Sequence, residues 1–165
     1  MTDLIRLGHD RQGRTFYLLP ISTLDDWPTA PDLPSPHFAL FLACNAKVLG
    51  RAALSRFAAQ RLGQGLAQLC AWGPGASLTV DVFEDVYELD QNDACLSESW
   101  VHLASSWHGH DTLEHALEFF FDCAQPSDPR ADCRVWIAAA IAMPQVAEEM
   151  GALLRDWVKD GINAA

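Results

Sequence analysis

The segment SSWHGHD, residues 105–111, gathers residue types that carry much of enzyme chemistry. His108 and His110 form an H-x-H pair, which Asp111 follows directly. Imidazole and carboxylate groups bind zinc, manganese and iron, and metallohydrolases often use an H-x-H pair at a strand end. One hypothesis is therefore a metal site at His108, His110 and Asp111. The competing interpretation is a polar turn between a strand and a helix, with Asp111 as the helix cap.

Nucleophilic catalysis is a second chemistry that these residue types allow. Ser105 or Ser106 with His108 would make a serine–histidine pair, although the chain has no G-x-S-x-G nucleophile elbow. Cys44 is another candidate nucleophile, but a thiol needs an electropositive neighbour to become a thiolate, and Lys47 is the sole cation close to it in sequence. A buried structural cysteine is the alternative interpretation of Cys44.

The segment GPGAS, residues 73–77, is a candidate phosphate site, because phosphates bind backbone donors where glycine-rich turns open a helix. It lacks the G-x-G-x-x-G spacing and a P-loop lysine, and the acidic residues Asp81 and Glu84 follow it. A nucleotide site stays open as an alternative, but we expect no cofactor.

Any such site must be positioned by strands and helices, and these alternate after residue 37. Apolar runs of strand length indicate strands that are buried on both faces, at 37–45, 66–73, 100–107 and 133–142. Amphipathic stretches that follow them indicate helices at 50–63, 77–89, 111–124 and 144–160. This alternation predicts an α/β fold, a three-layer Rossmann-like parallel sheet of about four strands flanked by helices.

A chain of 165 residues is expected to form a single domain. Short apolar runs at 4–8 and 15–21 predict an N-terminal β-hairpin within residues 1–24. Residues 25–37 are rich in proline, which favours an extended strap, and residues 38–160 form the strand–helix core.

Helix-start signals predict where the helices begin and which faces are buried. Ser77 is the expected N-cap of the second helix, and Asp111 is that of the third, with Glu114 placed for a capping box. Leu89 is expected on the buried face of the second helix, and Arg61 on the side of the first helix away from the core.

In an open parallel sheet, ligands bind beyond the carboxyl ends of the strands. The predicted strands end at Cys44 and Asn45, at Trp72, at Trp107 and at Met143. Asn45 therefore joins His108, His110 and Cys44 as a candidate catalytic residue. The two tryptophans, Trp72 and Trp107, are candidates for binding.

The formal net charge of −11 is unevenly spread. No lysine or arginine occurs from Leu62 to Pro129, and acidic residues recur at helical spacing in this stretch. Such a surface repels nucleic-acid phosphates and anionic membranes and attracts basic proteins, whereas a solvated surface kept for solubility is the competing interpretation. The candidate acidic binding residues are Asp81, Glu84, Asp85, Glu88, Glu114 and Glu118.

Composition also indicates the cellular compartment in which the protein is expected. The charged residues among the first twenty leave no apolar signal-peptide core, and the apolar run 135–143 is too short to span a bilayer. The five cysteines are scattered, with no C-x-x-C pair. We therefore expect a reduced, cytoplasmic protein.

The segments FLACNA, LCAWGP, SSWHGHDTLEHALEFFFDCAQP and IAAAIAMPQVAEEM resemble a family of small bacterial proteins of unknown function. Members of that family carry a C-A-W-G-P turn and a later W-H…L-x-x-A-L-x-F-F segment. The resemblance covers roughly residues 38 to 152 and implies a shared fold without an established activity. It directs attention to Trp72, Trp107 and His108.

The sequence thus leads to one hypothesis with two rivals. The first is a non-enzymatic acidic binding protein, of the immunity-like or antitoxin-like kind, that inhibits a basic protein partner. The second is a small enzyme, either a metal-dependent hydrolase or a nucleotide-binding protein, with its site at the carboxyl ends of the strands. The third is a scaffold or oligomerising subunit, and a homodimer stays open.

Overall fold

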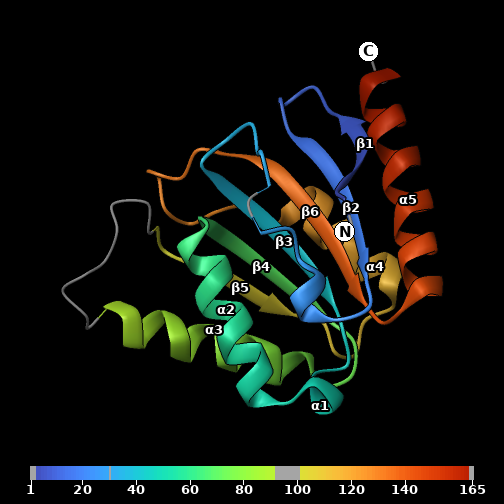
Figure 1. Ribbon diagram of the computed structural model, residues 1–165. Helices are drawn as coiled ribbons and strands as arrows, with labels where there is room; N and C mark the ends of the chain where they lie inside the picture. Colours follow the sequence, from blue (N-terminus) through green and yellow to red (C-terminus); the bar gives the residue numbers. More distant parts are fainter. Residues whose placement is uncertain (1–2, 30, 92–100, 164–165) are drawn as a thin grey trace.

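The computed structural model describes residues 3–29, 31–91 and 101–163, which form three layers, with helices on both faces of a central sheet (Figure 1). The sheet has six strands in the order β1-β2-β6-β3-β4-β5. Every neighbouring pair is parallel except β1 with β2. The expected α/β class with a largely parallel sheet is confirmed.

The four strands expected after residue 37 all occur. They are β3 (His37–Ala43), β4 (Leu66–Trp72), β5 (Ala104–Trp107) and β6 (Cys133–Ile141). Strand β5 is shorter than the expected 100–107: residue 100 lies outside the described residues, and 101–103 have no strand structure. Because β5 is the last strand in the order, it forms one edge of the sheet.

The expected N-terminal hairpin is present, but it also enlarges the sheet. Strands β1 (Ile5–His9) and β2 (Thr15–Ile21) pair antiparallel, and β2 pairs in parallel with β6 along its whole length. The sheet therefore has six strands where about four were expected. The reason lies in β2 itself: Phe16 and Leu19 are fully buried on opposite faces, so this strand belongs in the interior of the sheet.

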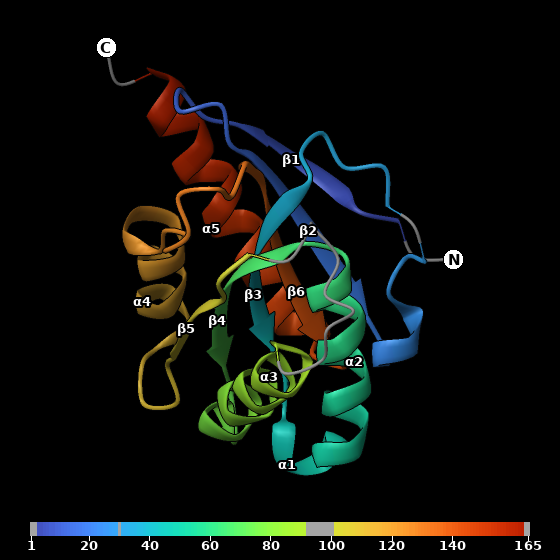
Figure 2. The same ribbon diagram turned by 90° about the vertical axis from the view of Figure 1, so that its left-hand side faces the viewer.

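Each face of the sheet buries one set of alternating side chains. Leu40 and Leu42 of β3 pack on the face covered by η1 (Leu24–Asp26), α1 (Ala46–Leu49), α2 (Arg51–Gly63) and α3 (Ala76–Gln91). Phe41 packs on the other face, which is covered by α4 (Leu113–Glu118), a π-helical turn (Phe119–Cys123) and α5 (Pro144–Asn163). Figure 2 shows the two helical layers on either side of the sheet.

The chain order explains where the connections change face. From β3 the chain moves outward to β4 and β5 with α2 and α3 on one face, then returns behind the sheet through α4 to β6. Strand β6 lies between β2 and β3, and the helix that follows it covers the opposite face from the helices after β3. The carboxyl ends of β3 and β6 therefore form a topological switch point.

Two expected helix starts are wrong by one or two residues. Helix α3 begins at Ala76, so Ser77 lies inside it and is not its N-cap. Helix α4 begins at Leu113, and its N-cap is Thr112, whose hydroxyl accepts a hydrogen bond from the His115 backbone N–H at 3.2 Å. Thr112 directly precedes the helix, so it takes the capping position that was expected of Asp111.

Two expected burial assignments are also wrong. Leu89 is 70% exposed, because the end of α3 extends beyond the sheet (Figure 1). Arg61 is only 4% exposed, because the strap folds back over the end of α2. Its guanidinium carbon lies 4.6 Å from the centre of the Trp27 ring and 4.8 Å from that of Phe57. Burial lowers the pKa of Arg61 to about 10.

Candidate functional site

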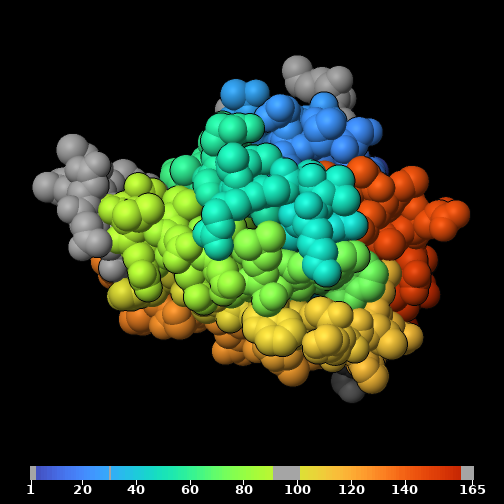
Figure 3. Space-filling model, turned by 90° about the horizontal axis from the view of Figure 1, so that it is seen from below, coloured from blue at the N-terminus to red at the C-terminus, as the bar shows by residue number. Residues whose placement is uncertain are grey.

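The carboxyl ends of the parallel strands meet at the lower edge of the molecule in Figure 1, which Figure 3 shows from below. On this surface α3, in green, lies next to the segment that follows β5, in gold. Most of the residues singled out by the sequence are at or near this carboxyl edge.

The central polar arrangement of the carboxyl edge joins Ser106, His108 and Asp111. The Ser106 hydroxyl lies 3.0 Å from Nε2 of His108, and Nδ1 of His108 lies 2.8 Å from a carboxylate oxygen of Asp111. When Nδ1 donates to Asp111, Nε2 of the neutral ring accepts the hydroxyl proton. A serine, a base and a group that orients the base are thus connected in the order of a catalytic triad.

The local backbone explains why the hydrogen-bonded relay of Ser106, His108 and Asp111 forms within one short segment. Side chains alternate along β5, so Ser105 donates to Glu84 on α3 at 2.6 Å, while Ser106 is on the other face. After the strand, the backbone N–H of His108 donates to the Ala71 carbonyl at 2.9 Å, which holds the histidine close to β4. The His108 side chain is consequently almost buried.

Asp111 is available to His108 because it does not cap α4. Its backbone carbonyl accepts a hydrogen bond of 3.0 Å from Trp72 Nε1. This bond ties the end of β4 to the turn that carries the relay. The His108–Asp111 contact has no signal in the sequence, because an aspartate at this position is equally typical of a helix cap.

The surroundings of the relay are apolar on one side. The Phe119 ring centre lies 4.8 Å from that of His108, at the start of the π-helical turn. Ser106 also lies 3.4 Å from the sulfur of Cys70, a fully buried thiol whose pKa is raised to about 11 by burial. That thiol stays protonated at neutral pH, so the nucleophile of this arrangement is the serine hydroxyl.

The two histidines of the H-x-H pair contact different groups. His110 lies beside Trp107, with ring centres 6.1 Å apart, whereas both nitrogens of His108 contact Ser106 and Asp111. Across residues 3–29, 31–91 and 101–163, no three His, Cys, Asp or Glu side chains are grouped to hold a metal ion. The geometry therefore supports the hypothesis of a metal site less than the hypothesis of a serine nucleophile.

Cys44 and Asn45 have structural contacts at the end of β3. Cys44 is 1% exposed, its sulfur lies 3.8 Å from the Thr79 hydroxyl, and burial raises its pKa to about 11. Asn45 caps α1 by accepting a hydrogen bond from the Val48 N–H at 3.3 Å. These contacts agree with the interpretation of Cys44 as a buried structural thiol.

The acidic residues project from two helices on opposite faces of the sheet, on either side of the β5 edge (Figure 2). Acids on α3 also contact other residues of the protein: Asp85 pairs with Arg51 at 2.9 Å, and Glu84 accepts from Ser105. Trp107 closes β5 and is 50% exposed. The exposed acids are Asp81, Glu84, Asp85 and Glu88 on α3 and Glu114 and Glu118 on α4.

Residues 17–157 match a protein family described as "Domain of unknown function (DUF7684)". The chain belongs to this family. The resemblance to an uncharacterised family that the sequence suggested is thereby confirmed. The DUF7684 match spans β2 to most of α5, which includes every residue of the carboxyl edge described above.

No curated protein matches the chain. No solved structure matches it either. None of the helices in the part of the chain that the structure describes has the length and hydropathy needed to cross a lipid bilayer.

Proposed function

We propose that this protein is a non-enzymatic binding protein that captures a basic protein partner, as an immunity-like or antitoxin-like inhibitor. The proposed binding surface is the α3–β5–α4 edge, defined by the exposed acids of α3 and α4 and by Trp107. One observation supports it above others: acidic residues from two separate helices flank a single edge strand that ends in a half-exposed tryptophan.

This arrangement has the composition of an interface with a central anchor. Tryptophan is enriched among the residues that contribute most to binding energy, and charges around such an anchor mainly steer association. No lysine or arginine occurs between Leu62 and Pro129 to weaken the negative potential of this edge. Arg51 does pair with Asp85, but both side chains are more than half exposed, so salt and water screen that pair.

Charge reversal tests the proposal. The double variants Glu84→Lys with Glu88→Lys, and Glu114→Lys with Glu118→Lys, change exposed residues and should leave the fold intact. At least one should slow association with the partner about tenfold or more at low salt, since electrostatic steering is lost. The partner is first isolated on the immobilised native protein and identified, and its association rates are then measured by surface plasmon resonance.

The matched control is Glu148→Lys with Glu149→Lys on α5. These two glutamates are also exposed and give the same change in net charge, but they lie on another helix, outside the α3–β5–α4 edge. The control should keep the native association rate. If all three double variants associate equally fast, or if the captured partners are not basic, the proposed function is wrong.

The enzyme alternative is supported by one specific observation, the Ser106–His108–Asp111 relay. In such an enzyme the Ser106 oxygen would attack the carbonyl carbon of an ester or amide while Nε2 of His108 takes the hydroxyl proton. The same proton would then pass to the leaving group, and Asp111 would stabilise the charged imidazole. Water would then attack the acyl-serine ester while His108 again takes a proton, which frees Ser106 and makes the reaction class acyl transfer to water.

A fluorophosphonate probe tests this second candidate, because it reacts covalently with activated serines. Labelling of Ser106, identified by peptide mass spectrometry, should disappear in His108→Gln and persist in Ser105→Ala, whose hydroxyl contacts Glu84 instead. An unlabelled native protein would remove the acyl-transfer candidate and leave the binding proposal untouched.

A further inference from the structure

The amino edge of the sheet, opposite to the carboxyl edge, holds a cavity of about 440 Å³. Its walls come from segments far apart in the sequence: the β1–β2 turn, the π-helical turn, the loop 124–131 and the start of β6. This volume is within the usual range for small-molecule sites. The wall residues used below are Arg14, Phe121, Pro126, Pro129, Cys133 and Trp136.

Arg14 supplies a fixed positive charge to this cavity. Its guanidinium carbon lies 4.8 Å from the centre of the Trp136 ring and 5.1 Å from those of Phe16 and Phe121. Nε donates to Asp10 at 2.7 Å, and one terminal nitrogen donates to the Phe121 carbonyl at 2.6 Å. These contacts hold the planar group in one orientation before any ligand arrives.

The other terminal nitrogen of Arg14, Nη2, makes no hydrogen bond with the described residues. Asp10 does not fill this role, because its second carboxylate oxygen accepts from the backbone N–H groups of Gln12 and Arg14 at 3.0 Å each. One edge of this partly buried guanidinium therefore remains free to donate.

Trp136 adds a second donor in the same cavity wall. The side chain is 3% exposed, and its Nε1 is buried without a hydrogen-bond partner among the described residues. A buried donor without a partner costs free energy, and native proteins rarely leave one without a reason. Indole and guanidinium are donor-only groups, so a ligand that pairs with both presents hydrogen-bond acceptors.

The neighbouring acidic group does not provide that acceptor. Asp128 also lines the cavity, but its carboxylate accepts from the His102 N–H and from the backbone and guanidinium of Arg130. The rest of the wall is mixed, with apolar groups from Phe121, Pro126 and Pro129 and polar groups from Gln12, Asp122 and Gln125. A ligand that pairs with the two donors presents acceptor oxygens, and its apolar part can lie on the apolar portion of the wall.

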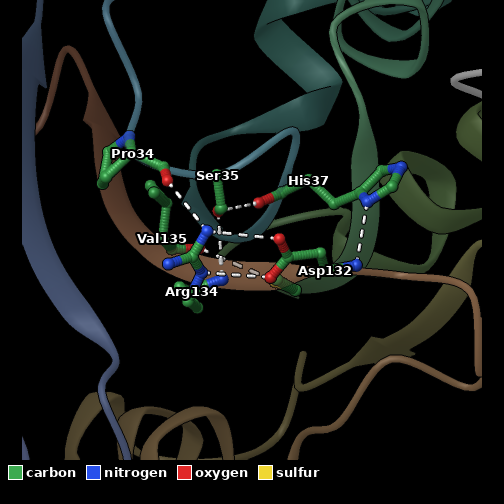
Figure 4. Close-up of polar contacts among 7 residues, drawn as sticks. Pro34, Ser35, His37, Asp132, Arg134 and Val135 are labelled. Carbon is green, nitrogen blue, oxygen red and sulfur yellow. Dashed lines mark hydrogen bonds and ion pairs between the residues drawn. The ribbon is translucent and has the colours of Figure 1, made fainter.

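Another arginine at the amino edge, Arg134, has hydrogen-bond acceptors within the protein for its guanidinium group. Figure 4 shows Arg134 bonded to both carboxylate oxygens of Asp132 and to the Pro34 carbonyl. Its side chain is 55% exposed, whereas that of Arg14 is 13% exposed. Arg134 does not line the cavity, which makes it a matched control for general attraction of anions.

We propose that the amino-edge cavity is a binding site for a small organic carboxylate. One carboxylate oxygen accepts from Nη2 of Arg14 and the other from Nε1 of Trp136, and the apolar body lies along Phe121, Pro126 and Pro129. The guanidinium carbon lies 4.8 Å from the indole ring centre, so the two side chains that carry these donors are adjacent in the cavity wall. This site is independent of the proposed partner surface, because neither Trp107 nor the acids of α3 and α4 that define that surface line the cavity.

The indole N–H resonances of the ¹⁵N-labelled protein test the proposal, with the Trp136 signal assigned through Trp136→Phe. Benzoate, phenylacetate and hexanoate are titrated to millimolar concentration. At least one of these acids should shift the Trp136 signal in a saturable manner and leave that of Trp107, at the other edge, unchanged. The matched neutral probe, benzamide for benzoate, should bind at least tenfold more weakly. Should no acid shift the Trp136 signal, or should benzamide bind as well as benzoate, the proposal is wrong.

Two variants test separately what the Arg14 and Trp136 donors contribute to binding of the acid. Trp136→Phe keeps an aromatic ring but lacks the N–H, and Arg14→Lys keeps the charge but lacks the planar fork. Each should weaken binding of the best acid about tenfold in a calorimetric titration, while Arg134→Gln should bind it like the native protein. Native affinity in Trp136→Phe, or an equal loss in Arg134→Gln, would show that the acid binds elsewhere or by charge alone, and would overturn the assignment.

Discussion

At the carboxyl edge, Ser106, His108 and Asp111 are bonded to one another, whereas at the amino edge Arg14 and Trp136 keep donors that no described residue accepts. The first group comes from a single short segment. The second is brought together from a hairpin turn and the start of β6. The two edges of one sheet thus differ in how their polar groups are satisfied.

This difference separates two kinds of recognition. The carboxyl edge offers an exposed tryptophan and acidic helices, which suit a protein partner. The amino edge offers an open cavity with donors already in place, which suits a small molecule. The rule that ligands bind at the carboxyl ends of parallel strands therefore indicates only one of the two sites.

The largest expected effect concerns the amino edge. Arg14→Ala removes the partner of the Asp10 side chain, which is 7% exposed, and leaves a buried carboxylate without its ion pair. Breaking such a pair from one side should lower the free energy of unfolding by about 3 kcal/mol. Urea unfolding followed by fluorescence measures the change.

Arg51→Ala is the control for this prediction. Arg51 also pairs with one aspartate, Asp85, but both side chains are more than half exposed. Removal of an exposed pair should change the free energy of unfolding by less than about 1 kcal/mol. Equal losses in the two variants would mean that the two ion pairs are equally solvated, which would contradict the burial of Arg14.

The sequence predicts the carboxyl edge better than the amino edge, for a physical reason. Strand–helix alternation is a local pattern, and it located the strand ends at Trp72 and Trp107 correctly. The cavity depends on β2 pairing with β6 and on the π-helical turn, whose Phe121 carbonyl accepts a hydrogen bond from Arg14. These contacts join residues more than a hundred positions apart, and no local spacing records them.

The same difference between local patterns and contacts of distant residues explains the smaller errors of the sequence-based predictions. Arg61 has the helical spacing of a solvent-facing residue, but its guanidinium packs against the Trp27 ring of the distant strap. The sequence offers either Ser105 or Ser106 as the partner of His108, and it misses the link to Asp111 because aspartate is also a common helix cap. A local signal with two valid explanations is decided only by the three-dimensional arrangement.

Thiol reactivity gives the second comparison of the edges. Cys70 near the relay is fully buried and has a pKa of about 11, raised by burial. Cys133 lines the cavity and is only partly buried, but its pKa is about 12, raised by burial and then by the charge of Asp132. Both thiols should therefore react at least about a hundredfold more slowly than a thiol with the ordinary value of 9.0.

Maleimide labelling at pH 8, read by peptide mass spectrometry, checks this, with the exposed Cys123 as the internal reference. The sign for stability follows from the raised values: protonated Cys70 and Cys133 contribute fully below pH 9, and this contribution is lost as the pH rises toward 11 and 12. The protein should thus unfold at lower urea concentration at pH 10 than at pH 8. Rapid labelling of Cys133 in the native state would show that the amino edge does not suppress ionisation.

The smallest expected effect distinguishes capping from orientation at the carboxyl edge. Thr112→Ala removes the hydroxyl that accepts from the His115 N–H, and it should lower the free energy of unfolding by about 1 kcal/mol. Asp111→Ala removes a side chain that is 48% exposed and bonded to His108, so its effect on stability should be smaller. Urea unfolding of both variants, with the His108 imidazole signals followed by NMR, separates the two roles. Thr112→Ala should leave those signals unchanged, whereas Asp111→Ala should shift them because Nδ1 loses its acceptor. A larger loss of stability in Asp111→Ala than in Thr112→Ala would show that Asp111 acts as the helix cap. That result would contradict the Ser106–His108–Asp111 relay.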